Sequence, residues 1–341
     1  MARRRRWMRQ PLSWRRGGAV ALLVLLAVAA AALVVDARSG GEFEPVREAI
    51  RERSSEPAQL LEETGRSARV VLLSDAHDVP AMKRVAVMAI EAMARGPGLD
   101  AVAVEIPSPE QPYIDAYLGQ QEENAALLLA RPDAVQERYG APREMLEIYR
   151  TVWRLNRELG AARRIRIIAA DLPMWPPPRG MAAPGVAQLY ARRTEHMLAR
   201  LDDEILSIKP DARILVFVDG YLALKRTYGE ASYAGGDPIR IDWLGERLRQ
   251  RAPHDTRTVL IDAAGAIAGV RPHPGYHGTR LFRALRREVG GTAAVRIGDA
   301  FAAIDDPVHE TSMPGLRIDI LPRGYSLVDA ADGYILLQPG R

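Results

Sequence analysis

Five short apolar runs, separated from one another by helical patterns, limit the fold more than any other feature of this sequence. The runs lie at residues 70–73, 101–106, 165–170, 214–218 and 258–261. Apolar residues at helical spacing cover residues 44–53, 57–63, 79–95, 111–118, 124–130, 143–159 and 186–207. Short strands that alternate with helices predict crossover connections and a mostly parallel sheet with helices on both faces. The sequence therefore predicts a single α/β domain at residues 61–341, with surface loops at residues 173–178 and 228–237.

The first forty residues predict a membrane anchor ahead of this domain. Residues 17–35 form an unbroken apolar run of nineteen residues, preceded by seven arginines and no acidic residue. Such a run is long enough to span a bilayer as a transmembrane signal-anchor. The positive-inside rule places residues 1–16 in the cytosol and the chain after Asp36 in the periplasm or exterior, with residues 36–60 as a juxtamembrane lead-in. A cleaved signal peptide is the alternative, although its apolar region usually has only about 7 to 15 residues.

Charge and cysteine content exclude several classes of protein. The chain has 47 basic and 43 acidic residues, and without the seven leading arginines the basic residues number 40. The folded part is thus slightly acidic, so nucleic-acid binding is not expected, and membrane topology explains the basic end. The sequence has no cysteine, which excludes disulfides, thiolate metal sites and a cysteine nucleophile. A metal would have to be held by His, Asp, Glu or Tyr.

An acidic residue lies near or just after the end of each predicted strand. These residues are Asp75, Glu105, Asp171, Asp219 and Asp262. Ligands of open parallel sheets bind outside the carboxyl ends of the strands, so the five carboxylates would face one rim. Capping of the next helix is the simplest alternative role, but it suits Asp171 poorly because prolines follow closely. Since crowded carboxylates repel each other, we expect a cation among them.

That cation could come from the protein or from a metal. Arg192 or Arg193 and His196, in the long helical pattern, could supply it from within the chain. Otherwise a divalent metal is the natural partner, with His77 as its nitrogen ligand.

His77 is the histidine whose surroundings best suit acid–base chemistry. It lies two residues after Asp75 on the first strand-to-helix turn, and the ordinary pKa of histidine suits proton transfer near neutrality. A lone histidine in a loop usually does no more than form a hydrogen bond, so the nearby acid is what supports a functional role. His273 and His277 have a spacing that binds metal on a helix, but Pro274 and Gly275 between them disfavour a helix. We expect a loop there that covers the rim.

Two stretches near the start of the domain carry a family resemblance. Residues 72–78 (LLSDAHD) and residues 99–107 (LDAVAVEIP) flank a predicted helix. This order resembles the superfamily of erythromycin esterases, ChaN-type haem-binding lipoproteins, TraB/GumN proteins and Tiki proteases. Its members typically begin with a strand, a Gly-Glu-x-His turn, a helix and a strand that ends in glutamate. Weaker similarity continues at residues 167–173, 192–197, 214–224, 243–248 and 331–336.

The resemblance implies that His77 and Glu105 are the principal functional residues, with Asp75 as a third catalytic residue. The residues that it associates with substrate or ligand are Asp171, Arg193, Asp219 and Tyr221. The sequence departs from the family at two places: Ser74 and Asp75 replace the usual Gly-Glu, and the segment from Asp219 to Tyr221 replaces a second histidine found in many members. Tyr221 can donate a hydrogen bond or ligate iron, but a pKa near 10 makes tyrosine a poor base at neutrality.

Three hypotheses about function follow. In the first, the protein is a hydrolase of an ester, lactone or peptide, in which His77 activates water and Glu105 or Asp75 orients it. In the second, it binds haem or another small molecule beside Tyr221 or His77, as the resemblance to ChaN implies. In the third, it keeps the scaffold without the chemistry and presents its surface to partners near the membrane. The cofactor thus stays open between a divalent metal, haem and none.

Overall fold

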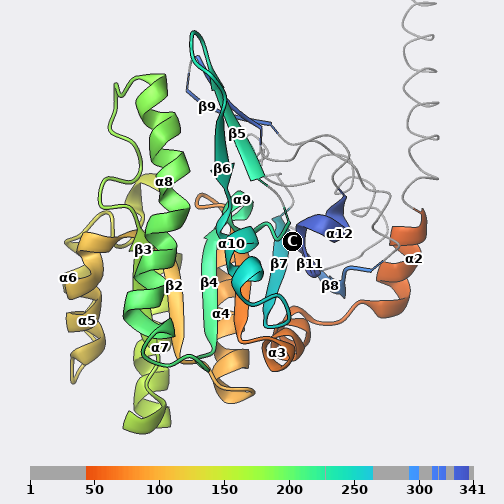
Figure 1. The fold of residues 1–341 in the computed structure, drawn as a ribbon. Helices are drawn as coiled ribbons and strands as arrows, with labels where there is room; N and C mark the ends of the chain where they lie inside the picture. The colour runs from red at the N-terminus through yellow and green to blue at the C-terminus, as the bar shows by residue number, and fades with distance from the viewer. Residues whose placement is uncertain are drawn as a thin grey trace, which may run out of the picture. The chain divides into compact units, whose positions relative to one another are not determined.

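A seven-stranded, mostly parallel sheet forms the centre of the protein in a computed structural model (Figure 1). The structure describes residues 44–226, 228–263, 292–298, 309–313, 315–319 and 326–337. The strands follow the order β3-β2-β4-β1-β7-β11-β8. Their bounds are β1 Val70–Asp75, β2 Ala101–Pro107, β3 Arg166–Asp171, β4 Ile214–Asp219, β7 Thr256–Ala263, β8 Ala293–Arg296 and β11 Gly333–Leu337. Within this sheet only β8 runs antiparallel to its neighbour, so the predicted α/β architecture is confirmed.

Helices cover both faces of this sheet. The bounds are α2 Glu44–Arg53, α3 Pro57–Ser67, α4 Pro80–Arg95, α5 Gln111–Gly119, α6 Ala126–Leu129, α7 Pro142–Leu159, α8 Ala183–Leu201, α9 Gly220–Ala223, α10 Leu244–Arg251 and α12 Leu327–Ala330, with short 3-10 turns η1 Ser108–Glu110, η2 Glu137–Tyr139 and η3 Ala161–Arg163. Helices α4 and α7 lie behind the strands in Figure 1, and α8, α9 and α10 lie in front of them. The helix predicted at residues 124–130 is shorter than expected, and the long helix predicted at 186–207 ends in a π turn, η4 Asp202–Leu206.

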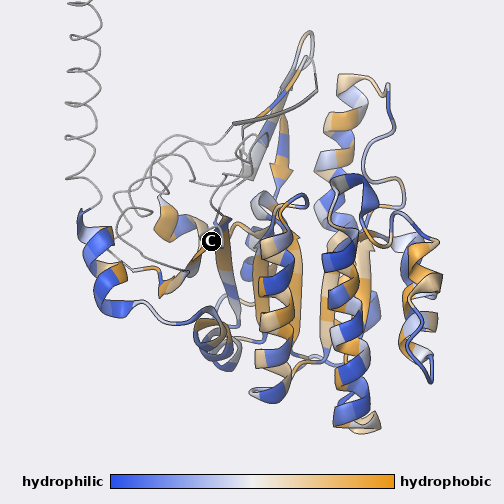
Figure 2. Ribbon diagram, turned by 180° about the vertical axis from the view of Figure 1, so that it is seen from behind, coloured by the Kyte–Doolittle hydropathy of each residue, from blue (hydrophilic) through white to orange (hydrophobic). Residues whose placement is uncertain are grey.

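The composition of the central strands explains why they need cover on both sides. Every residue of β1, β2 and β4 is buried, and continuous runs of this kind are typical of parallel strands packed between two helical layers. Figure 2 shows hydrophobic strands flanked by helices whose outer faces are hydrophilic. Because these strands carry no exposed face, the polar residues at their carboxyl ends are exceptions that need a separate explanation.

A second, antiparallel sheet corrects the interpretation of residues 228–237 as a loop. Strands β5 Tyr228–Tyr233, β6 Ile239–Asp242, β9 His309–Met313 and β10 Leu316–Asp319 form it in the order β6-β5-β10-β9. The hairpin of β5 and β6 buries Ala231 and Ile241 and turns through Gly235, which has a φ of 79°. The glycines in this stretch favour a loop, yet a glycine with a positive φ is also what a hairpin turn requires. The hairpin projects beyond the carboxyl ends of the main strands, at the top of Figure 1.

The described part of the chain contains no helix that is both long enough and apolar enough to cross a membrane. Residues 17–35, on which the predicted anchor rests, lie outside the described residues. The expected loop around His273 and His277 also lies outside them. The anchor and its topology therefore stay predictions.

The strand order predicts where a ligand would bind. Strand β1 lies between β4 and β7, and the chain leaves β1 for β2 on one side and later reaches β7 on the other. Such a reversal of winding opens a crevice at the carboxyl ends of the strands on either side of it. The neighbouring strands β2, β4 and β1 thus bring their last residues to one place.

Candidate active site

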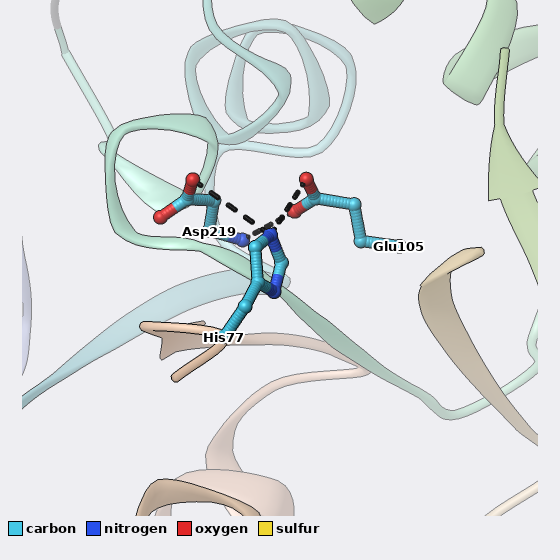
Figure 3. A group of neighbouring side chains, drawn as sticks. All are labelled: His77, Glu105 and Asp219. Atoms are coloured by element: carbon cyan, nitrogen blue, oxygen red, sulfur yellow. Dashed lines mark hydrogen bonds and ion pairs between the residues drawn. The ribbon is translucent and has the colours of Figure 1, made fainter. Parts of the chain in front are cut away.

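Three candidate functional residues of the sequence analysis meet at the carboxyl ends of neighbouring strands (Figure 3). His77 follows β1, Glu105 lies near the end of β2, and Asp219 ends β4. The Nε2 atom of His77 is 3.1 Å from Oε1 of Glu105 and 3.9 Å from Oδ2 of Asp219. A shared site requires these groups to lie within about 8 Å, the reach of one water molecule or metal. The distances satisfy that condition.

The other nitrogen of the His77 ring contacts Asp75. Nδ1 is 3.0 Å from Oδ2 of Asp75, and both side chains are buried. The carboxylate can only accept a hydrogen bond, so it holds the proton on Nδ1 and leaves Nε2 as the nitrogen that can exchange a proton. The ring of His77 is therefore fixed in orientation by two acidic residues.

Lys83 is a buried neighbour of the candidate site that sequence reasoning missed. Its Nζ atom donates to both carboxylate oxygens of Asp75, at 2.9 and 2.8 Å, and to the carbonyls of Ala76 and His77, at 3.1 and 2.7 Å. Although burial alone would raise the pKa of Asp75, Lys83 and His77 hold that pKa below its ordinary value. Lys83 thus keeps Asp75 ionised and fixes the turn that carries His77.

Arg193 on α8 supplies the internal cation that the sequence predicted. Its guanidinium donates to the two carboxylate oxygens of Asp171 at 2.9 and 2.6 Å and also to Oε1 of Glu105. It is completely buried and lies 3.7 Å from the ring centre of Trp175. Arg192 is instead exposed, and His196 is half-buried, with a pKa that burial lowers below its ordinary value. Arg193 therefore neutralises the site from the side opposite to Lys83.

The protonation states follow from these contacts. Burial alone would raise the pKa of Glu105, but Arg193 and His77 hold it well below its ordinary value. Burial raises the pKa of Asp171 in spite of Arg193. Burial alone would lower the pKa of His77, but the charge of Glu105 and the hydrogen bonds with Asp75 and Glu105 raise it to about 10. At neutral pH the resting site thus holds an imidazolium between two carboxylates.

Tyr221 lies beside Arg193 in an aromatic setting. Its hydroxyl oxygen accepts a hydrogen bond from Nη1 of Arg193 at 2.7 Å, and its ring is 6.2 Å from that of Tyr190 and 5.0 Å from that of Trp243. Burial raises the pKa of Tyr221 well above its ordinary value. The hydroxyl therefore stays protonated and can donate one hydrogen bond while it accepts another.

Two of the five strand-end acids have contacts that differ from the others. Asp219 accepts a hydrogen bond from its own neighbour, Gly220, while its backbone nitrogen donates to Oε2 of Glu105 at 2.7 Å. Asp262, on β7, accepts a hydrogen bond from the hydroxyl of Tyr334 on β11 at 2.5 Å. Burial raises the pKa of Asp262 to about 7. Asp262 thus forms a pair with Tyr334 on the neighbouring strand.

Comparison with known proteins supports the fold. No protein-family model matches the sequence, and no curated protein matches it. A mutant of the erythromycin esterase EreC in its open conformation aligns with a TM-score of 0.55 and 12% identity, over 82% of this chain and 93% of that one. A succinoglycan biosynthesis protein aligns with a TM-score of 0.55 and 10% identity, over 87% and 97% of the two chains. A protein from Bacillus cereus aligns with a TM-score of 0.54 and 10% identity, over 86% of this chain and 96% of that one. The chain therefore shares its fold with these three solved structures, one of which is an erythromycin esterase.

Proposed function

We propose that this protein is a hydrolase of esters or related acyl compounds, with His77 as its proton-transfer group. The observation that carries the proposal is the contact of both ring nitrogens of His77 with buried carboxylates, Asp75 and Glu105. Asp75 orients the ring, and Nε2 takes a proton from the attacking water and returns it to the leaving alcohol. The erythromycin esterase with the same fold acts on an ester, which favours this class of substrate.

The surrounding residues have positioning roles in this proposal. A water molecule that enters beside Nε2 lies within reach of Glu105 and Asp219, which can hold it for attack on the acyl carbon. Arg193 and Asp171 are completely buried and bonded to each other, so they act through Glu105 and do not need to touch the substrate. The hydroxyl of Tyr221 accepts a hydrogen bond from Arg193 and keeps its own proton, which it could donate to a substrate oxygen.

The pH dependence of ester hydrolysis tests this proposal. If the base form of His77 is required and its pKa is about 10, kcat/KM should rise about tenfold per pH unit between pH 7 and pH 9 and level off above that range. The measurement uses p-nitrophenyl acetate and the full chain in detergent. Because this ester also hydrolyses spontaneously in base, the rate with His77→Asn is subtracted at each pH. A profile that levels off near pH 7 would contradict the proposed role of Glu105 beside Nε2.

A divalent metal is the second candidate for this site. Nε2 of His77 and one carboxylate oxygen each of Glu105 and Asp219 lie within 4.8 Å of one another. Nitrogen and oxygen ligands in this number suit a divalent transition metal, and Asp75 would orient the ligating imidazole. When bound, such an ion would lower the pKa of a water molecule. Arg193 competes with this arrangement because it donates to the same oxygen of Glu105.

The haem and scaffold hypotheses have less support. Iron ligation by tyrosine favours the phenolate, whereas burial raises the pKa of Tyr221 well above its ordinary value. A scaffold without chemistry gains little from completely buried ionic groups such as Arg193 and Lys83, because such groups carry a large desolvation cost. In a hydrolytic site these buried charges have a role, because they neutralise the acidic residues that position His77.

We also propose that residues 17–35 anchor the protein with its folded part outside the cytoplasm. The support is the apolar run of nineteen residues and the seven arginines before it. The full chain, expressed in a bacterium, should stay in the membrane pellet after alkaline extraction, whereas a chain without residues 17–35 should appear in the supernatant. Protease added to spheroplasts should digest the folded part. Recovery of the full chain in the supernatant with a shortened intact mass would establish a cleaved signal peptide instead.

A further inference from the structure

Gln136 is a buried glutamine with an unusual backbone conformation. It lies just before η2, its side chain is 5% exposed, and its φ and ψ angles are 52° and 38°. Within the described residues it is the one non-glycine residue with a positive φ. Residues with a Cβ rarely adopt this left-handed conformation, and when they do the surrounding structure imposes it.

The side chain of Gln136 contacts the backbone of Glu105. Its Nε2 atom donates to the carbonyl oxygen of Glu105 at 3.1 Å. At this point the pairing of β2 with β3 shifts: Val104 lies opposite Ala169, but the next paired residues are Pro107 and Asp171. Two residues of β2, Glu105 and Ile106, therefore lie opposite one residue of β3, which is a β-bulge. The side-chain amide of Gln136 thus donates its hydrogen bond to the backbone carbonyl of a residue in the bulge.

The bulge affects the site because it directs the side chain of Glu105. Bulges bend a strand and turn a side chain to a new direction, often next to active sites. Oε1 of Glu105 reaches His77 and Arg193, and Oε2 accepts from the backbone of Asp219 at 2.7 Å. A small change in the direction of the Glu105 backbone would break these contacts together, because all of them depend on one carboxylate.

The segment that carries Gln136 is fixed to the rest of the protein. Arg131 forms two hydrogen bonds with the carboxylate of Glu110, at 2.8 and 2.6 Å, and Glu110 lies in η1 directly after β2. The hydroxyl of Tyr149 on α7 donates to the carbonyl of Ala134 at 2.6 Å. The segment is thus tied both to β2 and to the helical layer behind it. A fixed donor can hold the bulge in one geometry.

Only the donor end of the Gln136 amide has a partner. Its Oε1 atom is buried and accepts no hydrogen bond from any described group. A glycine would relieve the left-handed backbone, and an apolar side chain would avoid the unsatisfied oxygen. Neither glycine nor an apolar residue at position 136 could donate a hydrogen bond to the Glu105 carbonyl, whereas glutamine does. We propose that Gln136 is a positioning residue that holds the β2 bulge and thereby directs the Glu105 carboxylate onto the His77 ring.

The test observes the ring protons of His77 directly, so it does not require that the protein is a hydrolase. The charged groups around this ring are Asp75, Glu105 and Asp219, with Lys83 behind Asp75 and Arg193 behind Glu105. In the full chain labelled with 15N-histidine, NMR at pH 7 should show two slowly exchanging ring protons for His77. The Nδ1 proton reports the contact with Asp75, and the Nε2 proton reports the contact with Glu105.

Two variants of Gln136 are compared. Gln136→Leu removes the amide and keeps the bulk, while Gln136→Gly removes the amide and relieves the backbone. Both should lose the Nε2 proton signal and keep the Nδ1 signal. Retention of the Nε2 signal in Gln136→Gly, or its absence from the unsubstituted protein, would overturn the proposal. The glycine variant gives an answer even where the leucine variant fails to fold.

Gln111→Leu is the matched control. Gln111 is also buried, and its amide also bonds strand backbone, at the carbonyl of Ile167 and the nitrogen of Ala169 on β3. Its loss should lower stability and leave both His77 signals in place. Equal loss of the Nε2 signal in this control would show that the signal reports general destabilisation, and the proposal would fail.

A kinetic measurement rests on the proposed function. With p-nitrophenyl acetate, kcat of Gln136→Gly should fall about tenfold or more, because a displaced catalytic group slows the chemical step, while KM stays within about twofold. If the unsubstituted protein shows no turnover but the Nε2 signal depends on Gln136, the proposed function fails and the positioning role stands.

Discussion

Replacing His77 with asparagine should lower kcat for ester hydrolysis by at least about 100-fold, the usual contribution of a general acid–base group. Asparagine can still form a hydrogen bond with Asp75 but cannot take up the proton of the attacking water. Because Lys83 still neutralises Asp75 and Arg193 still neutralises Glu105, the variant should fold. Its circular dichroism spectrum and unfolding temperature check this, and kcat is measured with p-nitrophenyl acetate.

The matched control for this substitution is His254→Asn. His254 is an exposed histidine just before β7, so the same chemical change should leave kcat within about twofold. Elemental analysis of the unsubstituted protein and both variants distinguishes metal-free hydrolysis, with His77 as the base, from hydrolysis assisted by a divalent metal. A stoichiometric metal that is lost only in His77→Asn would favour the divalent ion, and an equal kcat in all three proteins would exclude His77 from the reaction.

Replacing Arg193 with methionine should lower the free energy of unfolding by about 3 to 5 kcal/mol at pH 8, the cost of leaving buried charges without their partner. Arg193 is completely buried between Asp171 and Glu105, so its loss removes the cation that these two carboxylates share. The unfolding temperature should fall by on the order of 10 °C for a domain of this size. Activity should fall as well, because Glu105 loses the group that holds it beside His77.

The effect of this substitution should depend on pH. With Arg193 present, the lowered pKa of Glu105 contributes stability above the ordinary carboxyl pKa, and this contribution is lost as pH falls. Without Arg193, Asp171 loses the charge that opposes the effect of burial on its already raised pKa, so its folded state binds a proton more tightly than its unfolded state and loses stability as pH rises. The loss of unfolding free energy in Arg193→Met should therefore be larger at pH 8 than at pH 5. Arg192→Met, at the exposed neighbouring position, is the control, and an equal deficit there would contradict the assignment.

The sequence predicts the site well where a side chain follows directly from a strand. Asp75, Glu105, Asp171 and Asp219 lie at or near the ends of strands that are recognisable from continuous apolar runs. The carboxyl ends of parallel strands meet at one edge of the sheet, so the proximity of these four side chains can be predicted without the conformations of the loops. The need for a cation among crowded acids then points to Arg192, Arg193 or His196, or to a divalent metal, and in the structure Arg193 contacts the acids.

Residues whose role depends on tertiary packing were not predicted. Lys83 lies between the buried residues Met82 and Val85 on α4, but a lysine in an amphipathic helix is normally exposed, and no local pattern shows that this one turns inward. Gln136 lies in a segment without periodicity, where neither its left-handed backbone nor its contact with a distant strand leaves a signal. Asp262 also lies near the carboxyl end of a predicted strand, as the other four acids do, yet its hydrogen-bond partner is Tyr334 on β11.

The alternation of side chains along β2 limits how such a protein can change during evolution. Val104 and Ile106 belong to the hydrophobic core, whereas Glu105 between them belongs to the site. Deletion of a single residue earlier in this strand would exchange the two faces, so that an acid would enter the core and an aliphatic side chain would face His77. Insertions and deletions that alter substrate preference are therefore expected in the connecting segments, such as the proline-rich one after β3, while the lengths of the central strands stay constant.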